Sequence, residues 1–271
     1  MKTLKNLFSA KNILIAVLIF ASQFFIAGCD REDSNPIIQE QTEEITGEEA
    51  AEIIAKELSG SEAEYGAAAV CEDAAYIVKG GNVNELPENN NITGYTVNDS
   101  TIIMEDNIAP YTYYFELTYG YDFIKNGRTF PVWAPGIDSA AVRYSSDGTY
   151  AAPVGNGNRT AHTEDLIFSG LAVTSQNFVI SGKYFWHSNS TASIGGKTLV
   201  VNGRLEMQDI LIQKTTLLIV GGSGKLEMTV ETNGGNSVAI DAEITFKSNS
   251  TAEITINGNT FTADLFTGEI I

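Results

Sequence analysis

The chain has 271 residues, 43% of them hydrophobic, and a formal net charge of −18 at pH 7. This length and apolar content suffice for one large domain or two small ones and exclude a chain that is disordered throughout. The large negative charge excludes a nucleic-acid-binding role, because such a surface repels the phosphate backbone.

Residues 1–28 have the pattern of a secretory signal. Lys2, Lys5 and Lys11 precede an apolar run at residues 13–26, which is the order of charge and hydrophobicity found in such signals. The run is shorter than the about 20 residues that a transmembrane helix needs. We therefore expect residues 1–28 to be removed from the mature protein.

The apolar run ends at Ile26-Ala27-Gly28-Cys29, which resembles the lipobox of bacterial lipoproteins. The resemblance implies that the lipoprotein processing machinery makes Cys29 the first mature residue and attaches acyl chains such as palmitate to it. Several acyl chains anchor a protein durably, because each buried methylene contributes roughly 0.8 kcal/mol. The alternative is an ordinary signal peptide that happens to be followed by a cysteine.

The next four residues, Asp30, Arg31, Glu32 and Asp33, resemble the lipoprotein export signal of Bacteroidetes, although Arg31 stands where lysine is usual. The resemblance implies that the export machinery places the protein on the surface of the cell outer membrane, held by its lipid anchor. The alternative is that these residues only begin a solvated tether. Residues 29–45 are polar and acidic and predict such a tether, with a span of roughly 20 Å.

Residues 46–81 predict a helical segment of two short amphipathic helices. Each begins with a capping box, opened by Thr46 in the first helix and by Ser61 in the second, and each has apolar residues at helical spacing. Cys71 falls on the apolar stripe of the second helix. We therefore expect it to be a small buried side chain rather than half of an intermolecular disulfide.

Residues 92–271 have the composition of an antiparallel β domain. Short runs rich in Thr, Val, Ile and Tyr are separated by NG, DG, GG and SN pairs, which mark tight turns. The fold class that we predict is mainly β, with about ten strands in an antiparallel β-sandwich or a half-open barrel, preceded by two short α-helices. The run TTLLIV at 215–220 is apolar on both faces and predicts a strand in the middle of a sheet.

The five residues SNSTA occur at 188–192 and again at 248–252. Around both copies apolar and polar residues alternate with a period of two and in the same phase. This agreement predicts a hairpin repeated at about 178–202 and 238–261, with SNSTA as its turn in both copies. We interpret the motif as a structural unit built twice rather than as a catalytic motif.

Residues 111–123, YTYYFELTYGYDF, place most of their aromatic side chains on one face of a strand. An exposed row of this kind would bind a sugar or an apolar ligand, whereas a buried row is core. We interpret it as core, because each such ring buries about 150 to 250 Å². Tyr114 and Trp133 fall outside this row and are the candidate ligand-facing aromatic residues.

The sequence predicts no enzymatic activity, no cofactor and no metal site. His187 is expected on an outward face beside a turn, and His162 has no second histidine or cysteine at metal-ligand spacing. The fragments GGKT at 195–198 and GGSGK at 221–225 lack the first glycine and the following helix of a phosphate-binding loop.

These features predict a lipid-anchored cell-envelope lipoprotein whose β domain binds or scaffolds, with a glycan or a protein as its ligand. An N-terminal helix before a strand meander also looks like the half-open barrels that carry lipoproteins or other lipids across the periplasm. That likeness is one of fold only and requires an apolar cavity. A third alternative is a glycan-binding or glycan-processing protein, in which acid pairs such as Glu164-Asp165 converge in a cleft.

Overall fold

The computed structural model describes residues 45–59, 66–80, 100–106, 112–130, 136–152, 155–172, 174–191, 198–232 and 235–271. The candidate lipidation residue Cys29, the export-signal residues Asp30, Arg31, Glu32 and Asp33, and Trp133 lie outside these ranges. The chain divides into two units, and every helix and strand named below belongs to the unit Glu43–Leu86 with Asn90–Ile271. None of the helices in the described ranges is long and apolar enough to span a membrane.

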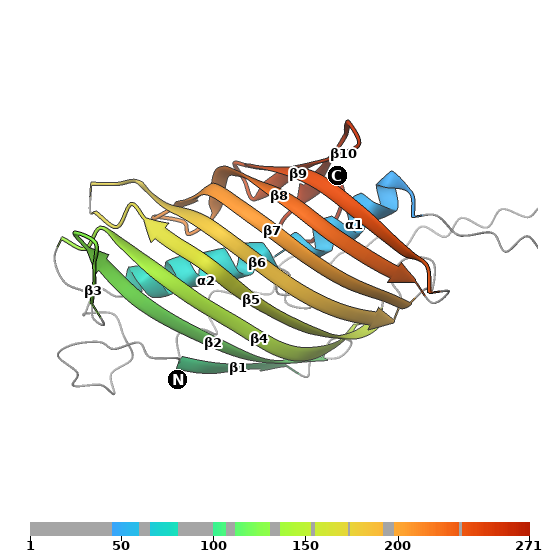
Figure 1. Cartoon of the computed structure of the whole chain (residues 1–271), viewed down its shortest axis with the longest axis horizontal. Helices are drawn as coiled ribbons and strands as arrows, with labels where there is room; N and C mark the ends of the chain where they lie inside the picture. The colour runs from blue at the N-terminus through green and yellow to red at the C-terminus, as the bar shows by residue number, and fades with distance from the viewer. Residues whose placement is uncertain are drawn as a thin grey trace, which may run out of the picture. The chain divides into compact units, whose positions relative to one another are not determined.

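The described residues form two helices and eleven strands (Figure 1). The helices are α1 (Gly47–Leu58) and α2 (Ala67–Gly80). The strands are β1 (Ser100–Asp106), β2 (Thr112–Lys125), β3 (Arg128–Phe130), β4 (Ser139–Ala152), β5 (Gly155–Ser169), β6 (Asn177–Thr191), β7 (Thr198–Gln213), β8 (Ile219–Thr232), β9 (Ser237–Lys247), β10 (Thr251–Ile256) and β11 (Asn259–Asp264).

All strands belong to one antiparallel sheet in the order β1-β2-β4-β5-β6-β7-β8-β9-β10-β11, with β3 paired to β2. Successive strands are neighbours, so the sheet is a meander, and its path does not close on itself. The mainly β, antiparallel fold with two short helices is therefore confirmed. The strands form one unclosed sheet instead of the two stacked sheets of a sandwich.

Helix α1 begins where the sequence predicted it. The Thr46 N–H donates to Glu49 Oε2 at 2.8 Å and the Glu49 N–H donates to Thr46 Oγ1 at 3.2 Å, which completes the capping box. Ile54 and Leu58 of α1 are buried, and α1 contacts β10 and β11. Both helices lie on the same side of the sheet (Figure 1).

Helix α2 packs against β6 and β7. Its Cys71 is a free, buried cysteine with Sγ 3.6 Å from Met207 Sδ of β7, so the prediction of a small buried side chain is confirmed. Burial raises the pKa of the Cys71 thiol to about 12, with a smaller contribution from Glu72. The thiol is therefore protonated and inert at neutral pH.

The face of the sheet toward the helices is the core. Along β9, Ile240, Ala242, Ile244 and Phe246 are buried, and the residues between them are exposed. In β2 the row Phe115, Leu117, Tyr119, Tyr121 and Phe123 is buried, which confirms the core interpretation of the aromatic stretch. The relative exposure of these side chains is only 1 to 4%, so little of their surface is accessible to water.

The two copies of SNSTA do not adopt the same structure. In the second copy residues 248–250 form the turn between β9 and β10, with positive φ at Asn249 (66°) and Ser250 (52°). In the first copy Ser188 to Thr191 continue β6 and pair with β7, so the prediction of a turn there is wrong. The Ser188 hydroxyl donates to Glu57 Oε1 of α1 at 2.7 Å, a tertiary contact that favours the extended backbone.

The prediction of a central strand at 215–220 is also wrong. Residues 214–216 form the turn between β7 and β8, and the Leu217 N–H donates to the Gln213 carbonyl at 2.7 Å. Leu217 has φ of 61°, and only Ile219 and Val220 of the run belong to β8. Leu217, which follows the turn, packs against the core.

A different unit occurs twice in the sheet, namely a bulge opposite a glycine. The pairing shifts between Glu164 and Ile167 of β5 and between Gln208 and Leu211 of β7. Gly182 and Gly222 on the next strands have φ of 150° and 117°, and a Cβ on either would lie 2.6 Å from the Cα of Leu166 or Ile210 at the bulge. Only glycine fits these two positions.

The carboxyl groups of Glu72 and Asp73 make stability depend on pH. Burial raises the pKa of Glu72 to about 7, partly opposed by a backbone hydrogen bond at Ile219, and raises the pKa of Asp73 to about 6. Because the folded-state pKa values exceed the unfolded ones, ionising these carboxyl groups costs more free energy in the folded chain than in the unfolded chain. This cost is absent below about pH 4, where both groups are protonated in both states. The folded chain therefore loses stability as pH rises through 6 and 7.

We therefore expect the melting temperature of the wild-type chain to fall between pH 5 and pH 8. It should fall less in the variant Glu72→Gln/Asp73→Asn, whereas Glu48→Gln, at an exposed position of α1, should follow the wild type. Differential scanning calorimetry at several pH values measures both slopes. Equal slopes for the wild type and the double variant would contradict the raised pKa values.

Candidate ligand-binding groove

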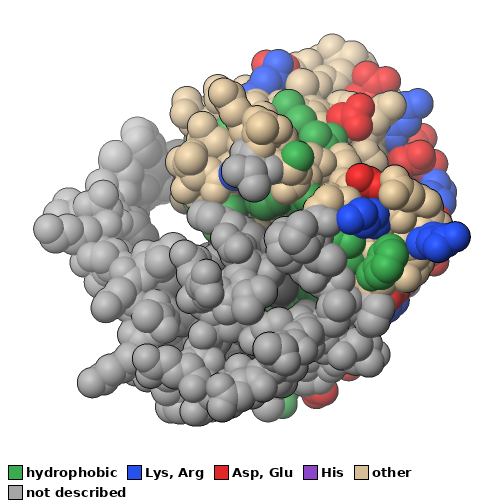
Figure 2. Space-filling view, turned by 90° about the vertical axis from the view of Figure 1, so that its left-hand side faces the viewer, with side chains coloured by type: hydrophobic (Ala, Val, Ile, Leu, Met, Phe, Trp, Pro, Cys, Tyr) green, Lys and Arg blue, Asp and Glu red, His purple; other side chains and the backbone are tan. Residues whose placement is uncertain are grey.

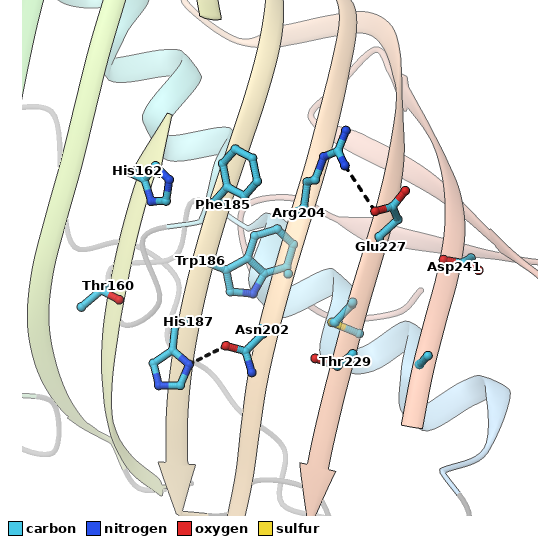
Figure 3. Close-up of a pocket in the computed structure, with 13 residues that line it drawn as sticks. Thr160, His162, Phe185, Trp186, His187, Asn202, Arg204, Glu227, Thr229 and Asp241 are labelled. Atoms are coloured by element: carbon cyan, nitrogen blue, oxygen red, sulfur yellow. Dashed lines mark hydrogen bonds and ion pairs between the residues drawn. The ribbon is translucent and has the colours of Figure 1, made fainter. Parts of the chain in front are cut away.

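A groove of about 530 Å³ lies on the outward face of the sheet, across β5 to β9 (Figure 3). The side chains of this face stand at every second position of each strand, opposite in direction to the core residues. Because the five strands pair in sequence order, outward residues that are far apart in the chain come to lie side by side.

Two rows of side chains cross the strands in direct register. One, which we call the charged row, consists of His162, Phe185, Arg204, Glu227 and Asp241, each opposite the next. The other, the neutral row, consists of Thr160, His187, Asn202, Thr229 and Ala239. Neighbouring strands are about 4.8 Å apart, so each row is about 19 Å long.

The charged row has two aromatic rings at one end and charged side chains along the rest. The rings of His162 and Phe185 are stacked, with 4.9 Å between their centroids and 7° between their planes. Arg204 Nη1 lies 3.5 Å from Glu227 Oε2, and its Nη2 lies 3.5 Å from Glu206 Oε2. These exposed ion pairs contribute little to stability, but they neutralise the guanidinium and restrict its orientation.

In the neutral row His187 Nδ1 lies 2.8 Å from Asn202 Oδ1 (Figure 3). An amide oxygen only accepts hydrogen bonds, so this orientation of the Asn202 amide assigns the proton to Nδ1. When the ring is neutral, its Nε2 is an acceptor, and the Asn202 amide nitrogen remains a donor. A ligand is thus offered a donor and an acceptor from adjacent strands.

A buried polar cluster lies beneath the rows and fixes the strands that carry them. Arg159, next to Thr160 in β5, forms an ion pair with Glu57 of α1, and its Nη2 donates to Tyr184 Oη at 3.1 Å. Ser188, next to His187 in β6, donates to the same Glu57 carboxylate. Helix α1 therefore holds β5 and β6 from the inner side.

Trp186 supports the middle of the groove. Its indole is buried, stacks on the Tyr184 ring with centroids 5.6 Å apart, and lies against Gly203 of β7. A Cβ on Gly203 would lie 2.1 Å from Trp186 Cζ2. The glycine between Asn202 and Arg204 is therefore required by the ring beneath it.

The residues of the groove define which contacts a ligand could make there. In the described part of the chain, no group of three or more His, Cys, Asp or Glu residues is placed to hold a metal ion. The groove offers rings, hydroxyls, an amide and a neutralised ion pair. Groups of these kinds can contact a ligand by packing and by hydrogen bonding.

The sequence predicted little of this groove. Tyr114 is 43% exposed, but it lies on β2 opposite Thr149 of β4, away from the groove. His187 is exposed, as expected, and His162 is exposed as well, yet both line the groove. The other members of the two rows named here were not predicted from the sequence: Phe185, Asn202, Arg204, Glu227 and Asp241. What these residues share in the sequence is that each stands at an outward-facing position of its strand. The register between the strands is needed to show that these positions lie side by side.

In comparisons with protein-family models, with curated proteins and with solved structures, nothing matched this chain.

Proposed function

We propose that this chain is a lipid-anchored protein of a bacterial cell envelope, displayed on the outer membrane, whose β domain binds a ligand without transforming it. The observation that carries the binding function is the pair of side-chain rows in register across β5 to β9. The ligand lies on the outward face of the sheet, while the inner face holds the fold together.

The anchor rests on the order of features at the N-terminus. A charged and then apolar segment ends at Cys29, and Arg31 with its acidic neighbours follows at once. The acidic chain would be repelled by anionic lipid headgroups, so the acyl chains supply the attachment. Figure 2 shows acidic and basic side chains intermixed on the described part of one face. A mixed surface of this kind does not attract anionic headgroups, which agrees with attachment through the acyl chains.

The packed inner face favours this function over that of a lipid carrier. A carrier needs an apolar cavity, whereas Phe115, Tyr119, Tyr184 and Leu205 on the inner face are at most 1% exposed. Core side chains that adjoined a cavity of lipid size would remain accessible from it. The described part of the inner face is therefore a weaker candidate for ligand binding than the groove on the outward face.

The first half of the experiment tests the anchor in cells that make the protein. We expect the wild type to incorporate labelled palmitate and to sediment with membranes, and we expect Cys29→Ala to do neither. External protease should digest the wild type on intact cells and spare the variant with alanine at 31, 32 and 33. Equal digestion of the two would contradict the export signal.

The second half tests occupancy of the groove with diethyl pyrocarbonate, which modifies exposed imidazoles. The chain has two histidines, and both line the groove. A bound ligand should slow the modification of His162 and His187 several-fold in cells relative to the purified protein. Exposed Lys247, outside the groove, should react with an amine reagent equally in both. Equal histidine rates would contradict ligand binding there.

A further inference from the structure

The footprint of the groove is long in one direction and narrow in the other. Each row spans about 19 Å across the strands, while alternate residues of one strand, and hence the two rows, are about 7 Å apart. A chain of small linked units lying across the strands fits this outline. A compact cofactor would contact only two or three of the five strands.

The central strands cannot bind a peptide by strand addition. β5 to β9 each pair with a neighbour on both edges, so their backbone N–H and C=O groups are already used. A peptide crossing the rows would have only side chains to satisfy its own backbone groups, and most would stay unpaired. The groove therefore favours a ligand whose polar groups lie on its periphery.

The side chains combine one aromatic position with dispersed polar groups. Phe185 is half-buried and stacked on His162 at one end, and Asn202, His187 and two threonine hydroxyls occupy the neutral row. A pyranose ring has C–H faces that pack on an aromatic ring and hydroxyls that both donate and accept. The pattern of the groove matches this chemistry.

The charges of the groove disfavour an anionic ligand. Arg204 is the single lysine or arginine among the described lining residues, and it is within 3.5 Å of both Glu206 and Glu227. Asp241 adds a further carboxylate to the same row. A phosphate or a carboxylate placed here would be repelled by Glu227 and Asp241, and the guanidinium of Arg204 is already shared between two carboxylates.

We infer that the groove binds an uncharged oligosaccharide across β5 to β9, with one sugar on Phe185 and hydroxyls bonded to His187 and Asn202. This inference rests on the proposed function and specifies its ligand. The acids of the charged row set the specificity against acidic sugars.

The test titrates the full-length protein by calorimetry with neutral oligosaccharides and with uronate oligosaccharides of matched length. We expect at least one neutral series to bind and the uronates to bind at least tenfold more weakly. Phe185→Ala should weaken neutral binding about tenfold, whereas Phe266→Ala, which removes a 51% exposed ring outside the groove, should not. The double variant Glu227→Gln/Asp241→Asn should reduce the ratio between the affinities for neutral and for uronate oligosaccharides.

Two results would overturn the inference. One is tighter binding of a uronate or of a basic peptide than of every neutral oligosaccharide, with dependence on Phe185. The other is the absence of neutral binding while His162 and His187 remain protected in cells, which would leave ligand binding intact and reject its sugar chemistry. Absence of both binding and protection would reject the proposed function as well.

Discussion

Replacing Glu57 with glutamine is expected to lower the free energy of unfolding by about 3–5 kcal/mol. The Glu57 carboxylate and the Arg159 guanidinium form an ion pair whose side chains are only 9% and 3% exposed. Glutamine keeps the shape and can still accept from the Ser188 hydroxyl, but it removes the charge that compensates Arg159. A buried guanidinium without its carboxylate is costly, because water cannot solvate it.

Urea denaturation of two further variants separates charge from packing. Glu48→Gln, at an exposed position of the same helix, should change stability by less than about 0.5 kcal/mol. Glu57→Leu combined with Arg159→Met should recover most of the loss, because a hydrophobic pair of similar volume needs no compensation. A loss below about 1 kcal/mol for Glu57→Gln would mean that the pair is not in a dry interior.

Replacing Gly203 with alanine is expected to cost about 1–3 kcal/mol, the usual price of overpacking a core. The added Cβ would lie 2.1, 2.3 and 2.4 Å from three atoms of the Trp186 indole, and that ring is only 4% exposed. A rigid, buried ring cannot move aside without disturbing Tyr184, on which it stacks. The strand or the ring must therefore shift.

Gly221→Ala is the matched control, because a Cβ there would meet the Leu211 side chain at 3.4 Å or more. We expect it to change stability by less than about 0.5 kcal/mol. Gly203→Ala combined with Trp186→Leu should cost less than the sum of the single variants, since the clash is lost with the ring. Additive losses would contradict the contact between Gly203 and Trp186.

Features encoded over a few residues were predictable from the sequence. The Thr46 capping box specifies the start of α1 through two local hydrogen bonds, and the alternation in residues 238–246 identifies the buried face of β9. Turn signals were less reliable where tertiary contacts compete with them. Ser188 and Asn189 resemble a turn, yet pairing with β7 and the bond to Glu57 keep them extended.

The candidate groove could not be predicted, because its rows depend on register. Each bulge inserts residues into one strand and shifts the pairing, so the phase of side chains changes along β5 and β7. Asp165 and Asp209 take positive φ at these bulges, but no local signal in the sequence marks them. The alignment of His162, Phe185 and Arg204 is thus a product of the whole sheet.

The central claim is that the outward groove binds the ligand while the inner face is a filled core. Native mass spectrometry of the Cys29→Ala chain, purified without detergent, tests it most directly. The packing of residues such as Phe115 and Tyr184 predicts the mass of the polypeptide alone. One lipid molecule retained per chain would contradict the claim, because it would require a cavity beneath the helices.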